Sequence, residues 1–186
     1  MGNNHPLDST EEALRDADAA GRVRARMLLA LSAFVLLWVF ANGLALWDQL
    51  PDPMPTHFGR GGAPDAWGPK NVFSVFGLLI LAAVMLVGIA LLRQRPQWYN
   101  FPGKEKARLL PPDQQSHVYA PLQEAMAWLA TCLAVGLSLL CQQMWFVSLH
   151  QRRAISPALA LAPAFIGLAA IIVGTVVAAR RLRRLS

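Results

Sequence analysis

The chain has 186 residues, of which 55% are hydrophobic and only 15% are charged, with a formal net charge of +6. A soluble domain of this size needs more polar surface than this composition supplies. A basic excess can indicate nucleic-acid binding, but these basic residues flank apolar segments and no basic-aromatic binding module accompanies them. We therefore exclude nucleic acid as a partner and expect a lipid bilayer.

Four apolar blocks of about 20 residues contain no charged residue, and about 20 helical residues span a hydrocarbon core. The blocks are Met27–Leu46, Val72–Leu92, Met126–Ser148 and Ala158–Ala179. The two-residue alternation of a β-barrel strand is missing from them. The sequence therefore predicts an all-α membrane protein with four transmembrane helices.

Residues 1–26 precede the first block and are interpreted as a polar cytoplasmic tail. Ser9-Thr10-Glu11-Glu12 matches a capping box, which predicts a short helix from there toward Arg26. A cleaved signal peptide ending near Ala41-Asn42-Gly43 is disfavoured, because the apolar run is too long and continues past that point.

The first two spans form a two-helix domain over residues 27–92, joined by a loop from Leu50 to Lys70. Between Trp47 and Lys70 the chain has five prolines and four glycines. Proline fixes φ and glycine allows positive φ, so this composition predicts a folded turn system rather than a flexible tether. We expect residues 56–58 to be extended, residues 59–62 to reverse the chain, and Pro64-Asp65 to begin another turn.

The distribution of basic residues predicts the orientation in the membrane. Thirteen of the seventeen lysines and arginines lie in the two tails and the second loop. The positive-inside rule then places both termini in the cytoplasm and the loop at residues 50–70 on the outer side of the inner membrane. The last tail, residues 180–186, is a juxtamembrane basic cluster, for which contact with lipid headgroups is the simplest interpretation.

The cytoplasmic loop at residues 93–125 is predicted to hold a structured turn at residues 99–104 and a helix capped near Asp113 that runs into the third span. His117 and Tyr119 are interpreted as ordinary interfacial residues. The second helix pair covers residues 126–179. Its two cysteines, Cys132 and Cys141, lie on opposite helix faces as buried thiols.

Small residues recur every four positions in the last span, at Ala170, Gly174 and Ala178. This spacing favours close helix packing, within the chain or between copies, and packing within the chain is the preferred interpretation. The cytoplasmic loop carries no motif for a protein partner, although a cytoplasmic partner is compatible with it.

The candidate ligand-binding residues fall in two groups, both near the predicted outer face. Asn42, Gln142 and Gln143 lie toward the outer ends of their spans, and Asn71 and Ser74 open the second span. Polar side chains within a bilayer usually face the bundle or a wet cavity. The second group belongs to the loop itself and comprises His57, Phe58, Asp65, Trp67 and Lys70. Both groups have a structural alternative, in which their hydrogen bonds hold the loop and the bundle together.

The loop resembles a bacterial membrane domain of unknown function that also begins SdpI-type immunity proteins. The resemblance rests on Leu-Pro-x-x-Met-Pro-Thr-His-Phe and Gly-x-x-Asp-x-Trp-Gly-x-Lys, and on Asn-Phe-Pro-x-Lys at residues 100–104. It implies a role in protection against a secreted, membrane-active peptide, or in signalling to a transcriptional repressor.

We expect a non-enzymatic protein without a cofactor that recognises an extracellular peptide or small amphiphile. HExxH and GxSxG motifs and paired intramembrane carboxylates, which would indicate a hydrolase, are missing from the sequence. One alternative is a divalent-metal site that joins His57 and His150 to Asp48, Asp52 or Asp65, although these spacings match no zinc signature. Another is a structural or accessory subunit of a membrane complex.

Overall fold

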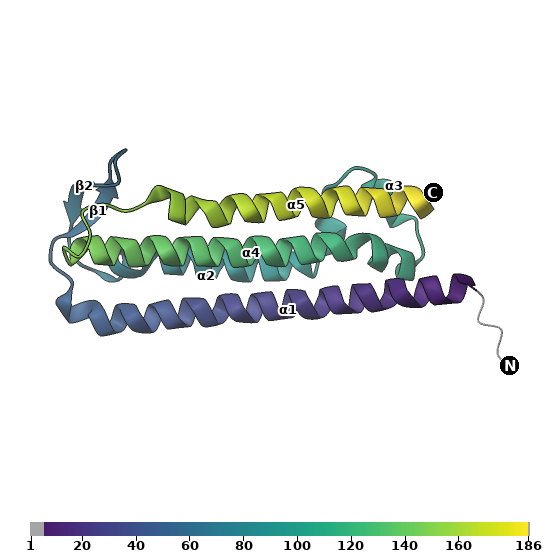
Figure 1. Cartoon of the computed structure of the whole chain (residues 1–186), viewed down its shortest axis with the longest axis horizontal. Coiled ribbons are helices and arrows are strands. Elements are labelled where there is room, and N and C mark those ends of the chain that lie inside the picture. The colour runs from purple at the N-terminus through teal and green to yellow at the C-terminus, as the bar shows by residue number, and fades with distance from the viewer. Residues whose placement is uncertain (1–5, 186) are drawn as a thin grey trace.

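A computed structural model describes residues 6–185 as an elongated helical bundle with a small β-hairpin at one end (Figure 1). Four of its helices are long and apolar enough to cross a membrane, which identifies a multi-pass membrane protein. The elements in chain order are α1 (Pro6–Leu46), η1 (Trp47–Gln49), β1 (Met54–Phe58), β2 (Pro64–Gly68), α2 (Val72–Arg93), η2 (Pro96–Trp98), α3 (Lys104–Arg108), α4 (Pro112–Ser148) and α5 (Pro157–Leu185).

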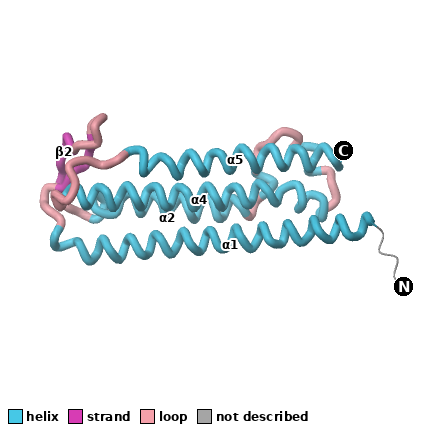
Figure 2. Tube along the Cα trace, viewed as in Figure 1, coloured by secondary structure: helices cyan, strands magenta, loops and turns pink. Residues whose placement is uncertain are grey.

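The central element of the bundle is α4, which packs against α5, α1 and α2. In Figure 1, α1 and α5 lie on opposite sides of α4, and α2 lies behind it. The chain ends and α3 lie at one end of the bundle and the hairpin at the other (Figures 1 and 2). The two ends are called the terminal end and the hairpin end below.

The predicted N-terminal tail is largely helical and continuous with the first span. Because α1 begins at Pro6, the capping box expected at Ser9–Glu12 lies within the helix and does not begin it, so that prediction was wrong. Residues 1–5 of the predicted tail lie outside the described residues.

The expectation of an all-α protein was also incomplete, because the segment between the first two spans forms a two-stranded antiparallel sheet. The extended segment expected at residues 56–58 and the reversal expected at residues 59–62 are confirmed. In the reversal, Gly59 N donates to Ala63 O at 2.9 Å and Gly62 N donates to Gly59 O at 2.8 Å. The turn expected at Pro64-Asp65 was wrong, since both residues belong to β2, where strand pairing takes their backbone.

The predictions for the third span were partly right. As expected, α4 begins before the apolar block and runs through it without interruption. It starts at Pro112 after Pro111, which makes no side-chain cap, so the cap expected near Asp113 was wrong. The structured turn expected at residues 99–104 is present between η2 and the first residue of α3, with Gly103 in the left-handed region at φ 90°.

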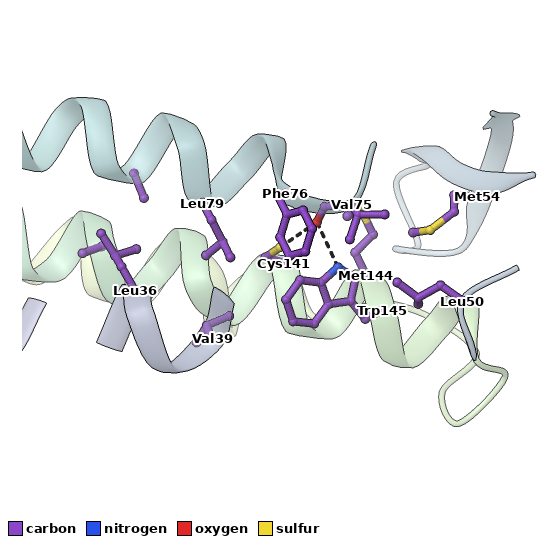
Figure 3. Packing of buried hydrophobic residues seen from close by; sticks show 12 residues of the cluster. Leu36, Val39, Leu50, Met54, Val75, Phe76, Leu79, Cys141, Met144 and Trp145 are labelled. Atoms are coloured by element: carbon purple, nitrogen blue, oxygen red, sulfur yellow. Dashed lines mark hydrogen bonds between the residues drawn. The ribbon is translucent and has the colours of Figure 1, made fainter. Parts of the chain in front are cut away.

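The larger hydrophobic cluster lies toward the hairpin end and joins α1, α2, α4 and the start of the hairpin. At its centre, the Val75 carbonyl accepts hydrogen bonds from Trp145 Nε1 at 3.0 Å and from Cys141 Sγ at 3.3 Å (Figure 3). Met54, from β1, is fully buried in the same cluster. The hairpin and the bundle therefore share one core.

Cys132 and Cys141 are both buried free thiols on different sides of α4, as predicted. Cys141 faces the Val75 carbonyl of α2, whereas Cys132 faces Gly167 of α5. The close packing predicted for Gly174 is also confirmed within the chain. A Cβ there would lie 2.7 Å from Ala125 Cβ, so glycine allows α5 to approach α4 closely.

Candidate functional site

The hairpin is fixed to the bundle at its base and at its tip. Leu50 and Met54, which lead into and begin β1, are 2% and 0% exposed. At the tip, Ile155 N donates a hydrogen bond to Gly62 O at 2.8 Å, which joins the hairpin to the segment between α4 and α5. The hairpin therefore forms a docked cap over this end of the bundle.

Lys70, which follows β2, holds the base of the hairpin through hydrogen bonds. Its Nζ donates to the carbonyls of Leu50 at 2.9 Å and Trp47 at 3.2 Å, and it lies 5.6 Å from the Trp47 ring centroid. Its backbone N–H donates to Asp52 Oδ1 at 2.9 Å. These contacts occupy the ammonium group of Lys70, so the structure places this predicted ligand-binding residue in a structural position.

His57 and Asp65 face each other across the two strands, with His57 Nδ1 2.5 Å from Asp65 Oδ1. Their side chains are 70% and 50% exposed, so the pair lies on the hairpin surface. A carboxylate at Nδ1 fixes the orientation of an imidazole and leaves Nε2 as its second polar atom. The pair therefore presents one oriented nitrogen toward the surroundings.

A groove runs from this pair toward the membrane-spanning part of the bundle, where the hairpin meets α2 and α4. Its volume is about 660 Å³. The groove has a polar rim, formed by Thr56 and His57 of β1 and by Asn71 and Ser74 at the start of α2. Its apolar wall includes Phe73 and Leu78 of α2 and Leu140 and Met144 of α4, together with Phe58 of β1. This feature is called the hairpin groove below.

Trp67 does not line the hairpin groove. It lies in a second depression of about 450 Å³ together with Val147, His150, Arg152 and four prolines of the hairpin segment. Its side chain is 56% exposed. The structure thus divides the predicted loop residues between two depressions, with His57 and Phe58 in one and Trp67 in the other.

The polar residues expected beneath the loop have separate partners. Asn42 Nδ2 donates to the Trp38 carbonyl of its own helix at 2.7 Å, and Gln142 is half-buried on α4. Gln143 is 4% exposed, and its Oε1 accepts from Ser156 N at 2.6 Å, which holds the segment before α5. Asn42 and Gln143 thus bond to different segments, and neither these two residues nor Gln142 lines the hairpin groove with His57.

Asn71 and Ser74, expected near the same cluster, cap α2. Asn71 Oδ1 accepts from the backbone N–H groups of Phe73 and Ser74, and Ser74 Oγ accepts from Asn71 N. This reciprocal arrangement is a capping box, which satisfies donors at the first turn of a helix. The same two residues form part of the polar rim of the hairpin groove.

The metal-site hypothesis has no support from the geometry. Within the described part of the chain, no group of three or more His, Cys, Asp or Glu side chains lies close enough to hold a metal ion. His57 and His150 line different depressions, so the proposed ligands do not converge.

The sequence interpretation missed a charged cluster at the terminal end. Asp18 is 8% exposed; its Oδ2 lies 2.7 Å from His117 Nδ1, and its Oδ1 accepts from Arg181 Nη1 at 2.8 Å. This cluster joins α1, α4 and α5, so His117 was wrongly interpreted as an ordinary interfacial residue. Pro121 was the sequence feature that could have indicated this contact, because a proline inside a helix leaves the carbonyl four residues earlier without its usual N–H donor. That carbonyl is His117 O, which accepts from Arg181 Nη1 at 2.6 Å.

Comparisons with known proteins find a family model that is similar to the segment containing the hairpin. Residues 33–86 match a family model described as a domain of unknown function, DUF1648. An uncharacterized protein from Archaeoglobus fulgidus is similar to this chain, with 37% identity over 86 residues. The alignment covers 42% of this chain and 45% of the archaeal protein, so it spans less than half of that relative. No solved structure matches the chain significantly.

Proposed function

We propose that this protein is a non-enzymatic receptor that binds an amphiphilic ligand in the hairpin groove. The observation that carries the proposal is the composition of the groove, which has a polar rim with His57 and an apolar wall on α2 and α4. An amphiphile places its polar group at such a rim and its apolar part against such a wall, because both surfaces are then satisfied.

The wall of the groove continues onto surface that suits a bilayer. Phe73, next to the rim residue Ser74 in the first turn of α2, is 77% exposed, and Ile80 and Val84 further along α2 are 40% and 65% exposed. Large apolar side chains exposed along a transmembrane helix face lipid. A membrane-dissolved ligand therefore has a lateral route into the groove, with its polar group at the level of His57.

The proposal includes the orientation of the protein in the membrane. Both described chain ends lie at one end of the bundle, opposite the hairpin (Figure 1), and this end carries most of the arginines and lysines. The positive-inside rule then puts the terminal end in the cytoplasm and the hairpin groove on the outer face of the cytoplasmic membrane. An outer groove is accessible to secreted peptides.

The resemblance of the hairpin segment to the start of SdpI-type immunity proteins supports a membrane-active peptide as the ligand. The family model for a domain of unknown function matches residues 33–86, which include this hairpin segment and the flanking parts of α1 and α2. Binding at the groove would serve protection, by sequestering the peptide, or sensing, through a cytoplasmic partner at the terminal end.

A binding experiment with three variants tests the proposal. The protein is reconstituted in nanodiscs and titrated with a dansyl-labelled amphipathic Lys/Leu helix of about 20 residues. We expect His57→Ala and Leu78→Trp to weaken binding about tenfold, because one removes the oriented imidazole and the other fills the apolar part of the groove. Gly61→Ala is the control, since a Cβ there has no atom within 4 Å.

Thermal unfolding of each variant separates binding from folding. The proposal fails if His57→Ala and Leu78→Trp bind the peptide as well as the parent protein does. It also fails if they weaken binding only in proportion to a fall in the unfolding midpoint, because the hairpin residues would then be structural.

A further inference from the structure

Another groove, separate from the hairpin groove and from the depression beside Trp67, runs along α4 between α1 and α5. Its volume is about 570 Å³. It exists because α1 and α5 each pack on α4 rather than extensively on each other. It is called the α1/α5 groove below.

Small residues make this groove deep at the points where the helices come together. Gly21 of α1 lies against Glu124, and a Cβ there would be 3.0 Å from Glu124 Oε2. Gly174 of α5 lies against the Pro121 carbonyl, where a Cβ would be 2.9 Å away. Both glycines line the groove, so its floor is formed partly by backbone.

Toward the hairpin end, the walls of the groove are apolar and open to the membrane. Trp128, Ile166 and Val173 line this part and are 42%, 59% and 61% exposed. All three belong to the uncharged blocks that span the hydrocarbon core. This part of the groove therefore suits a hydrocarbon chain.

Toward the terminal end, the same groove ends in two pairs of opposite charges. Arg24 Nε lies 2.9 Å from Glu124 Oε1, and Arg181 Nη1 lies 2.8 Å from Asp18 Oδ1. All four residues line the groove. Glu124 and Arg181 lie two residues and Arg24 three residues outside an apolar block, at the depth where lipid headgroups begin, and Asp18 lies nine residues before the first block.

We infer that the α1/α5 groove binds one glycerophospholipid whose headgroup carries both a phosphate and a primary ammonium. The acyl chain lies along Trp128 and Val173, the phosphate lies beside Arg24, and the ammonium lies beside Glu124. Arginine forms strong charge-assisted hydrogen bonds with phosphate, and a primary ammonium donates such bonds to a carboxylate.

The balance of charge selects this occupant over other lipids. Two arginines and two carboxylates line the polar end, so its net charge is zero. An anionic headgroup such as phosphoglycerol places its negative charge next to Asp18 and Glu124 and offers them only neutral hydroxyl donors, which bind a carboxylate less strongly than an ammonium does. A choline headgroup has a positive charge but no N–H donor for the carboxylates.

Photo-crosslinking tests this inference directly. The full chain is reconstituted in nanodiscs of phosphatidylcholine that contain an equal fraction of diazirine-acyl phosphatidylethanolamine, phosphatidylcholine or phosphatidylglycerol. Peptide mapping then measures the crosslink yield at Trp128 and Val173. We expect phosphatidylethanolamine to exceed both other lipids by about threefold, the range of a partly exposed ion pair.

Two variants and a control identify the groove as the source of the selectivity. Glu124→Gln removes the partner of the ammonium and should equalise the yields of phosphatidylethanolamine and phosphatidylcholine. Val173→Trp fills the apolar part and should abolish the groove crosslinks at Trp128. Ile172→Trp is the control, because Ile172 is 58% exposed on the same helix but does not line the groove.

Several outcomes would overturn the inference. These are equal yields for the three lipids in the parent protein, a higher yield for phosphatidylglycerol, or crosslinks at Trp128 that persist in Val173→Trp. Because neither variant touches the hairpin groove, peptide binding there should be unchanged.

Discussion

Gly62 and Ile155 meet in backbone contact, with the Ile155 N–H donating to the Gly62 carbonyl at 2.8 Å. Gly62 has a φ of 74°, and a Cβ on it would lie 2.2 Å from the Ile155 carbonyl oxygen. Only glycine satisfies both conditions, since other residues are strained at this φ and have no space here. This contact attaches the tip of the hairpin to the segment between α4 and α5.

Gly62→Ala should therefore release the tip of the hairpin. We expect a loss of about 3 kcal/mol in unfolding free energy, from left-handed backbone strain together with overpacking. Thermal unfolding in detergent, followed by tryptophan fluorescence, measures it. Gly61→Ala is the matched control, because a Cβ there meets nothing within 4 Å. Equal stability of the two variants would contradict the account of this contact.

Lys70→Met should destabilise the base of the hairpin, whatever ligand the protein binds. The variant leaves the carbonyls of Trp47 and Leu50 without the donor that they have in the parent protein. We expect a cost of about 2 kcal/mol, the range for loss of a hydrogen bond to a charged group. Chemical unfolding without ligand measures it. An unchanged midpoint would show that these hydrogen bonds do not stabilise the hairpin, and Lys70 would then be a candidate for ligand contact.

Arg181→Met should destabilise the terminal end by about 2 kcal/mol, because the buried Asp18 carboxylate and the His117 carbonyl both lose a donor. A second substitution isolates one of these contacts. Pro121→Ala supplies an N–H to the His117 carbonyl, so Arg181→Met should cost about 1 kcal/mol less in that background. A double-mutant cycle in detergent measures the coupling energy. Perfect additivity would show that Arg181 does not replace the missing helical donor.

Ionisation of Tyr99 should make the protein less stable at alkaline pH. Burial raises the pKa of Tyr99 above its ordinary value, and its hydroxyl donates to the Arg93 carbonyl at 2.7 Å. The folded state thus holds the phenol proton more tightly than the unfolded state does. The resulting stability is fully present below the unfolded pKa, near 10, and is lost as pH rises above it.

The unfolding midpoints of the parent protein and of Tyr99→Phe, measured at a series of pH values between pH 8 and pH 11, test this prediction. The variant lacks the phenol, so its stability should fall less steeply above about pH 10. Parallel curves for the two proteins would show that Tyr99 does not contribute to the alkaline loss.

Most of the bundle was predictable from local features of the sequence. The uncharged blocks have the length of a membrane span, and the helices of the structure contain all four of them. The extended segment at residues 56–58 and the reversal at residues 59–62 followed from proline and glycine, which restrict or widen φ at their own positions. The spacing of Gly174 among small residues likewise indicated close helix packing.

The second strand and the charged cluster were not predictable in this way. Pro64-Asp65 favours a turn locally, but pairing with β1 makes it a strand, and that pairing depends on the docking of the hairpin. Asp18, His117 and Arg181 lie far apart in the chain, so their contacts depend on how three helices align.

The same division applies to the candidate site. The sequence by itself determined which residue types the hairpin segment carries, because proline, glycine and polar side chains act locally. Only the tertiary structure decided their partners: Lys70 with backbone carbonyls, His57 with Asp65, and Trp67 in a separate depression. The physical reason is that hydrogen bonds and grooves form between segments that packing brings together, and sequence spacing does not specify that packing.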